Sequence, residues 1–236
     1  MTVAEIMAQL KEMGSAQTVK TFANHGAPID KMYGVKVGDL KTIVKKVKKN
    51  HELSLELYRT GNSDAMYLAG LIADEKKITK EDLQEWVRGA YWYMLSEYTV
   101  AWIAAESRFG WELGLEWIES DVETIADAGW ATLSNVVSIQ PDAELDFGKL
   151  EELILRVENT IHQAPNRVRY AMNSFLLCVG GYCPLLTERV KQAANKIGKV
   201  EVNMGTTHCN VPYVPDYLKN MEARGVIGKK KKMARC

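Results

Sequence analysis

The sequence predicts an all-α protein built as an α-solenoid, in which antiparallel helix pairs stack side by side. Apolar residues recur at helical spacing along nearly the whole chain, with only a few residues of turn between segments. Strand patterns are almost missing, apart from the short "KVEVNMG" at residues 199–205. A chain of 236 residues with 47% hydrophobic content can form one core or a continuous repeat stack. A compact helical bundle is the alternative, but a dozen helices are too many for a simple bundle.

The expected helices are short and most have a recognisable start. Thr79 precedes "KEDLQEWV" with acidic residues in the first turn, and Pro184 opens "LLTERVKQAANKIG". No strict internal repeat is visible, so the solenoid prediction rests on rhythm. The expected ranges are 2–13, 36–49, 51–60, 63–75, 80–90, 91–107, 110–119, 121–139, 146–162, 165–180, 183–198 and 213–224.

One domain is expected over residues 1–227, followed by a basic tail at 228–236 that we expect to be disordered. No apolar run reaches the roughly 18 residues of a membrane span, and the first helix lacks the features of a signal peptide. Four cysteines do not make a disulfide framework in a chain of this length. We therefore expect a cytoplasmic monomer that does not contact a membrane.

The charge is balanced in total but divided along the chain. Residues 1–50 carry 9 Lys/Arg against 4 Asp/Glu, residues 51–160 carry 8 against 22, and residues 161–236 carry 13 against 4. Two basic ends around an acidic middle can grip a polyanion such as nucleic acid. The other interpretation is that these surfaces pair within the fold or keep it soluble.

The stretch "QAPNRVRYAMNSFLL" at 163–177 is a helix with an unusual polar side. At 100° per residue, an apolar side that includes Phe175 lies opposite a side made of Asn, Arg and Tyr. A purely structural helix would carry Lys and Glu there, so these side chains are candidates for recognition. They are Asn166, Arg169, Tyr170 and Asn173.

Three segments together resemble the HEAT-like-repeat DNA alkylation repair proteins, the AlkD-type alkylpurine DNA glycosylases and their relatives. They are "YGVKVGDLKTIVKKV" (33–47), "IADAGWATLSNVVS" (125–138) and "APNRVRYAMN" (164–173). The resemblance implies an α-solenoid curved around a concave basic groove that binds alkylated duplex DNA. It also implies release of cationic N3- or N7-alkylated purines without a cofactor, because a positively charged base is already a good leaving group. One carboxylate and flanking aromatic rings then stabilise the positive charge.

The residues of that reaction are only partly matched. Active relatives place an aromatic residue one helical turn before an Asp, and here the best pair is Tyr93 with Glu97, whose longer side chain displaces the carboxylate. The family's Arg before the "AGW" segment is Asp127, a reversal of charge. A Trp and an Arg of the next concave helix are replaced by Ser174 and Leu177.

Glu97 thus has three interpretations: a displaced catalytic carboxylate, a ligand contact of another kind, or a solvated helix residue. The aromatic residues Tyr93, Trp92 and Trp130 are candidate nucleotide contacts, with core packing as the alternative.

A zinc site is not expected. Cys178 and Cys183 are far from the adjacent His208 and Cys209, and this spacing matches no common zinc signature. No P-loop, dinucleotide fingerprint or zincin motif is present.

Cationic side chains suited to phosphates occur in two places, on a lysine-rich helix and at the start of the 163–177 helix. An exposed outer helix that is merely solvated is the alternative for the lysines. The candidates are Lys41, Lys45, Lys48, Lys49 and Arg167.

Three functions remain open: a DNA glycosylase acting on alkylated purines, a non-catalytic nucleic-acid or ligand-binding module on the same fold, and a protein–protein scaffold. The segment 199–212 is expected to be an ordered extended loop, without an assigned role.

Overall fold

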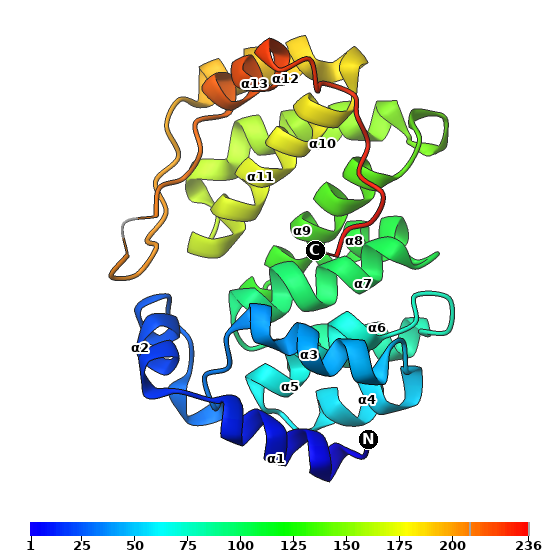
Figure 1. Cartoon of the computed structure of the whole chain (residues 1–236). Helices are drawn as coiled ribbons and strands as arrows, with labels where there is room; N and C mark the ends of the chain where they lie inside the picture. Colours follow the sequence, from blue (N-terminus) through cyan, green and yellow to red (C-terminus); the bar gives the residue numbers. More distant parts are fainter. Residues whose placement is uncertain (208, 236) are drawn as a thin grey trace.

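The computed structural model describes residues 1–207 and 209–235, and it confirms the all-α prediction: these residues form helices and contain no strand. The chain leads from α1 at the bottom of Figure 1 to α12 and α13 at the top. A π-helical segment, Met94–Val100, precedes α7. The α-helices are α1 (Val3–Met13), α2 (Ala16–Asn24), α3 (Val37–Val47), α4 (His51–Arg59), α5 (Ser63–Ile72), α6 (Lys80–Gly89), α7 (Ala101–Glu106), α8 (Gly110–Trp117), α9 (Glu123–Ile139), α10 (Phe147–Thr160), α11 (Asn166–Tyr182), α12 (Thr187–Ile197) and α13 (Val214–Ala223).

Local capping explains why the predicted starts agree with the structure. Thr2 and Glu5 form a capping box at the start of α1, and Thr79 and Asp82 form another at α6. Each pair satisfies two backbone N–H groups that have no partner inside the helix. The signal is contained within four residues, so the sequence alone is enough to reveal it.

Three local predictions need correction. Helix α2 was not expected, because it buries only Thr18 and is held by its Ser15 cap and by the Ser15 N–H donating to Gly34 O at 3.1 Å. The helix expected over 91–107 is divided into the π-helical segment and α7. Residues 199–205 form no strand.

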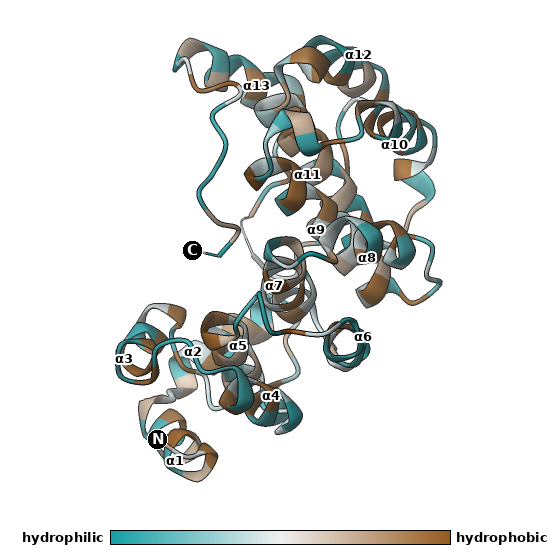
Figure 2. Cartoon of the chain, turned by 90° about the vertical axis from the view of Figure 1, so that its right-hand side faces the viewer, coloured by the Kyte–Doolittle hydropathy of each residue, from teal (hydrophilic) through white to brown (hydrophobic). Residues whose placement is uncertain are grey.

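The helices form two layers. Helix α9 packs against α11 on one side, against α7 and the π-helical segment on the other, and against α8 behind it. Helix α5 continues the inner layer beyond the π-helical segment and packs on α4. The outer helices have one hydrophobic and one hydrophilic side (Figure 2), so apolar side chains fill the space between the layers. No helix in the described ranges is long and apolar enough to cross a bilayer.

The basic tail is not disordered: residues 228–235, called the strap below, run along the C-terminal ends of four inner helices. Gly228 N donates to Gly181 O of α11, Lys231 N to Ser138 O of α9, and Arg235 to Gly70 O of α5. Helix C-terminal carbonyl groups lack intrahelical donors and carry partial negative charge, so a cationic segment stabilises them. Cys236 lies outside the described residues.

Candidate functional site

The π-helical segment carries the predicted carboxylate, Glu97, and buries it. Its side chain is 7% exposed and is bound by Arg167 from the first turn of α11, with Nε at 2.9 Å from Oε1 and Nη2 in contact with the same oxygen. Single π-helical turns inside helices frequently occur at functional sites. The predicted catalytic carboxylate is therefore paired with an arginine of the same chain.

The Arg167 guanidinium lies between two aromatic rings. Its Cζ is 4.1 Å from the ring centroid of Tyr93 and 4.5 Å from that of Tyr170. A desolvated guanidinium over a tyrosine face is an attractive arrangement. Tyr93, Glu97 and Tyr170, predicted as parts of a ligand site, thus come together around a cation that the protein supplies itself.

A second carboxyl group, that of Asp127 on α9, lies beside Glu97. It is 1% exposed, and neither of its oxygens accepts a hydrogen bond from an N–H or O–H donor in the described part of the chain. Burial raises the pKa of Asp127 well above its usual range, and the negative charge of Glu97 raises it further. Because the pKa of Asp127 is raised further than that of Glu97, which Arg167 stabilises in its charged form, this arrangement favours the proton on Asp127.

These charges set the chemistry of the site. Burial raises the pKa of Glu97, while the charge and hydrogen bonds of Arg167 oppose that rise. The Glu97 carboxylate is therefore balanced by the Arg167 guanidinium, while Glu123, which accepts the Arg167 backbone N–H at 2.7 Å, adds a further carboxylate nearby. A carboxylate in this state cannot stabilise positive charge developing on a sugar unless Arg167 first moves away.

A cavity of about 320 Å³ opens beside this group, at the N-terminal ends of the inner helices. Its wall combines Trp92, Tyr93 and Asp127 with Asn166 and Arg167. Glu123, residues 203–205 and the end of α2 also line it. We call it the arginine cavity.

Two of the predicted aromatic contacts are packing residues. Trp130 is 1% exposed and packs edge-on against Phe175 in the core, at 5.2 Å between centroids. Trp92 is also buried, and its indole Nε1 donates to Ser63 Oγ at 2.9 Å. Trp92 borders the arginine cavity, whereas Trp130 does not.

The polar side of α11 binds the chain's own loop at 199–212. Asn166 Nδ2 donates to Asn203 O at 2.9 Å, Arg169 Nη1 to Glu201 O at 2.9 Å, and Asn173 Nδ2 to Pro212 O at 3.0 Å. The polar side chains expected to recognise a ligand thus bind residues of the same chain. The loop at 199–212, to which the sequence assigned no role, is the segment that they hold in place.

The same loop reaches the other end of the molecule. Thr206 N donates to Asn24 O at the end of α2, 3.0 Å away, and Figure 1 shows loop and helix facing each other at the left. Gly205 has φ of 73°, and a Cβ built there would lie 2.1 Å from Asn24 O. Only glycine permits this approach, so the loop and the end of α2 together form one wall of the arginine cavity.

The predicted phosphate contacts divide in two. Arg167 is engaged by Glu97, and Lys49 pairs with Glu75 at 2.5 Å. The other three predicted lysines lie on α3 and at its C-cap. They are exposed and form no ion pair with any described residue. They are Lys41, Lys45 and Lys48.

The metal prediction can be examined only in part, because His208 lies outside the described residues. Within the described ranges, no three His, Cys, Asp or Glu side chains are grouped to hold a metal ion.

The sequence did not predict the ion pair between Glu97 and Arg167. The two residues are 70 positions apart, and nothing local distinguishes a paired arginine from one that binds phosphate. The charge reversal at Asp127 was the available signal, since a buried acid beside an acid requires a cation or a proton.

Comparisons with known proteins agree with this fold. The chain is 34% identical over 229 residues to the uncharacterized protein Lin0241 of Listeria innocua, covering 94% of this chain and 98% of that protein. It is equally similar to the uncharacterized protein Lmo0209 of Listeria monocytogenes.

A solved structure superimposes over 100% of both chains with a TM-score of 0.91 and 36% identity. It is described as representing a new family of proteins related to the HEAT-like repeat DNA glycosylases, with affinity for branched DNA structures. A family model described as DNA alkylation repair enzyme matches residues 6–193. With that match covering most of the chain, the protein belongs to the DNA alkylation repair family of HEAT-like-repeat proteins.

Proposed function

We propose that this protein binds branched DNA through its hollowed face and does not excise bases. The observation that carries the proposal is the pairing of Arg167 with Glu97. The carboxylate at the position of the glycosylase acid is buried and neutralised by Arg167, whose guanidinium contacts two tyrosine rings. At the Glu97 position the site thus lacks the free negative charge that base excision requires.

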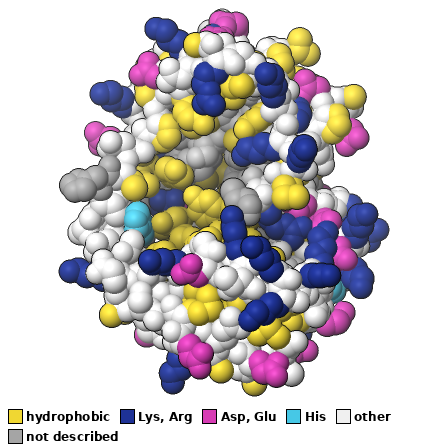
Figure 3. Space-filling view, viewed as in Figure 1, with side chains coloured by type: hydrophobic (Ala, Val, Ile, Leu, Met, Phe, Trp, Pro, Cys, Tyr) yellow, Lys and Arg dark blue, Asp and Glu magenta, His cyan; other side chains and the backbone are white. Residues whose placement is uncertain are grey.

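Access to the site supports the same proposal. The arginine cavity measures about 320 Å³ and is bounded on one side by the contact between Thr206 and Asn24. A duplex is far too wide to reach Glu97 through that contact. DNA would therefore contact the edges of the central hollow of Figure 3 rather than Glu97 itself.

Cations are available on those edges. Figure 3 shows Lys and Arg side chains gathered beside a central hollow lined by hydrophobic side chains. Lysines on exposed surfaces contribute affinity through phosphate contacts without reading sequence. The solved relative with affinity for branched DNA shares the whole fold at 36% identity, which makes a branch the preferred target.

The test compares a four-way junction with a linear duplex of the same sequence, each at about 50 mM salt, where phosphate contacts are strong. We expect tighter binding of the junction and a steep loss of affinity with salt. In parallel, methylated DNA is incubated with the protein and released bases are measured by chromatography. No 7-methylguanine or 3-methyladenine should appear.

Two results would replace the proposal. Release of either base, abolished in Glu97→Gln, would establish the glycosylase. Absence of binding to both DNAs would favour a protein–protein scaffold.

A further inference from the structure

A second hollow lies at the opposite edge of the inner helices, where their C-terminal ends meet the strap. It has a volume of about 780 Å³ and is bordered by α3, by the ends of α5, α7 and α9, and by strap residues 232–235. We call it the strap groove. It shares no lining residue with the arginine cavity.

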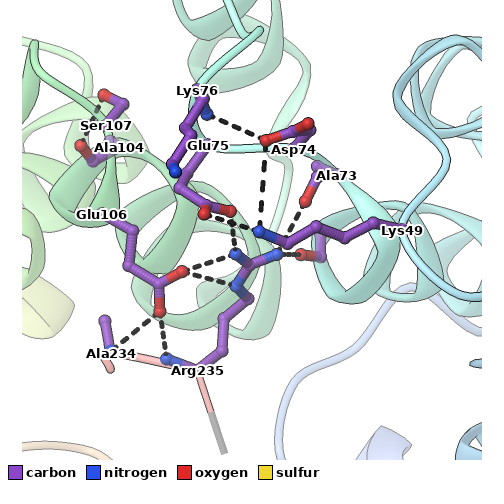
Figure 4. A network of polar contacts seen from close by, with 11 residues as sticks. Lys49, Ala73, Asp74, Glu75, Lys76, Ala104, Glu106, Ser107, Ala234 and Arg235 are labelled. Atoms are coloured by element: carbon purple, nitrogen blue, oxygen red, sulfur yellow. Dashed lines mark hydrogen bonds and ion pairs between the residues drawn. The ribbon is translucent and has the colours of Figure 1, made fainter. Parts of the chain in front are cut away.

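The strap forms one bank of this groove and is held firmly. Arg235 Nε donates to Glu106 Oε2 at 2.7 Å, and its Nη2 lies 2.7 Å from Glu75 Oε2 (Figure 4). Its Nη1 also donates to Ala73 O at 2.8 Å, at the end of α5. The backbone N–H groups of Ala234 and Arg235 donate to Glu106 Oε1. The position of the bank is therefore fixed by the fold.

Each bank presents one cation that has no acid to neutralise it. The two carboxylates of the groove, Glu75 and Glu106, are bound by Arg235, and Lys49 binds Glu75 as well. Lys41 on α3 and Lys232 on the strap form no ion pair with any residue in the described ranges. The groove therefore has a surplus of positive charge, one lysine on each side.

The walls between these lysines are largely apolar. Val44, Leu71 and Ile139 line the groove from three different helices. Met233 of the strap lines it as well, and it is 57% exposed, which is unusual for an apolar side chain. Such walls gain from contact with the apolar faces of a ligand.

We propose that the strap groove binds an unpaired DNA strand at a branch. This inference rests on the proposed binding of branched DNA and names the part of the DNA that the groove takes. A single strand offers phosphates to the lysines of both banks and unstacked bases to the apolar walls. A paired duplex keeps its bases stacked inside and offers the walls nothing. The combination of two cationic banks with an apolar floor thus matches a strand rather than a duplex.

The test uses two DNA probes and two pairs of variants. One probe is a fork with unpaired arms of about 15 thymidines, within the range of known single-strand sites, and the other is a fully paired four-way junction. Lys41→Glu and Lys232→Glu reverse one charge on each bank. Lys46→Glu and Lys229→Glu are matched controls, because these exposed lysines lie on the same segments but do not line the groove.

We expect the double variant Lys41→Glu/Lys232→Glu to lose affinity for the fork by about tenfold or more. The slope of log affinity against log salt should fall by about 1.4, as for two lost single-strand phosphate contacts. The control double variant, and the paired junction with either variant, should change much less. Met233→Asp should weaken binding of the fork again, because it places a carboxylate against the bases.

Failure of this inference is distinct from failure of the proposed function. If the wild type binds the junction but groove and control variants lose fork affinity equally, the groove is not a strand site. If the groove variants weaken both probes equally, it contacts paired DNA only. If the wild type binds neither probe, the proposed function itself fails.

Discussion

Two arginines anchor opposite edges of the inner helix layer, and their surroundings differ. Arg167 lies between two tyrosine rings beside the buried carboxyls of Glu97 and Asp127. Arg235 is bound by Glu75 and Glu106 and by backbone carbonyl groups. The first neutralises the carboxylate at the position of the glycosylase acid. The second fixes a chain segment and leaves the lysines next to it free.

Protonation separates the two sites. At Arg167 two acids share one cation in a buried place, so Asp127 keeps its proton. At the other edge, burial opposes ionisation, but hydrogen bonds from Lys49 and Arg235 lower the pKa of Glu75 to about 2. A buried carboxyl pair with one cation therefore lies at one edge, and a charged, partly hydrated cluster at the other.

The largest effect is expected from Arg167→Ala, which leaves Glu97 buried without its cation. Breaking a buried pair from one side costs about 3–5 kcal/mol, measurable by urea denaturation. Adding Glu97→Gln should recover much of the loss. Arg169→Ala on the same helix, which removes only a hydrogen bond to Glu201 O, serves as the control. Equal losses in both arginine variants would contradict the buried pair.

Arg235→Ala should destabilise the protein by about 2 kcal/mol, since hydrogen bonds to charged groups are lost from a partly hydrated site. It should also free the strap, so trypsin would cut at residues 229–232 faster than in the wild type. Lys229→Ala should leave the remaining sites protected, because Lys229 forms no ion pair with any residue that the structure describes. A strap that stays resistant in Arg235→Ala would show that Arg235 is not the anchor.

The pH dependence of stability should distinguish the two edges. The folded protein holds the Asp127 proton more tightly than the unfolded chain, because its pKa is raised. Stability therefore falls as pH rises from about 4 towards the folded-state pKa, by about 1.4 kcal/mol per unit at most for this one group. Asp127→Asn should make stability depend less on pH. Thermal unfolding measured from roughly pH 5 to roughly pH 8 would show this. An unchanged slope would mean that Asp127 is already ionised.

The smallest global effect is expected at the loop that borders the arginine cavity. Gly205→Ala should cost about 1 kcal/mol for its left-handed backbone, and the contact with Asn24 O should open as well. Gly198→Ala has the same kind of backbone, with φ of 74°, but its Cβ would meet no atom within 4 Å. Faster hydrogen exchange at Thr206 in Gly205→Ala alone would support this contact, and equal exchange in both would argue against it.

The sequence by itself determined the helices and their order. Capping at Thr2 and Thr79 and apolar spacing act within a few residues, so these features are visible without a structure. It also brought Tyr93, Glu97 and Tyr170 into one site, although their roles remain predictions. Helix α2 was not predicted, because its stability depends on packing against other segments rather than on its own apolar pattern.

Only the tertiary structure decided what the polar and charged side chains bind. The stripe Asn166, Arg169 and Asn173 is indistinguishable in sequence from a ligand site, yet it holds residues 201–212. Arg235 reaches Glu75 across 160 positions, which turns an apparently loose tail into an ordered bank. A hydrogen bond or ion pair has no sequence period, because its partner is fixed only when distant segments pack together.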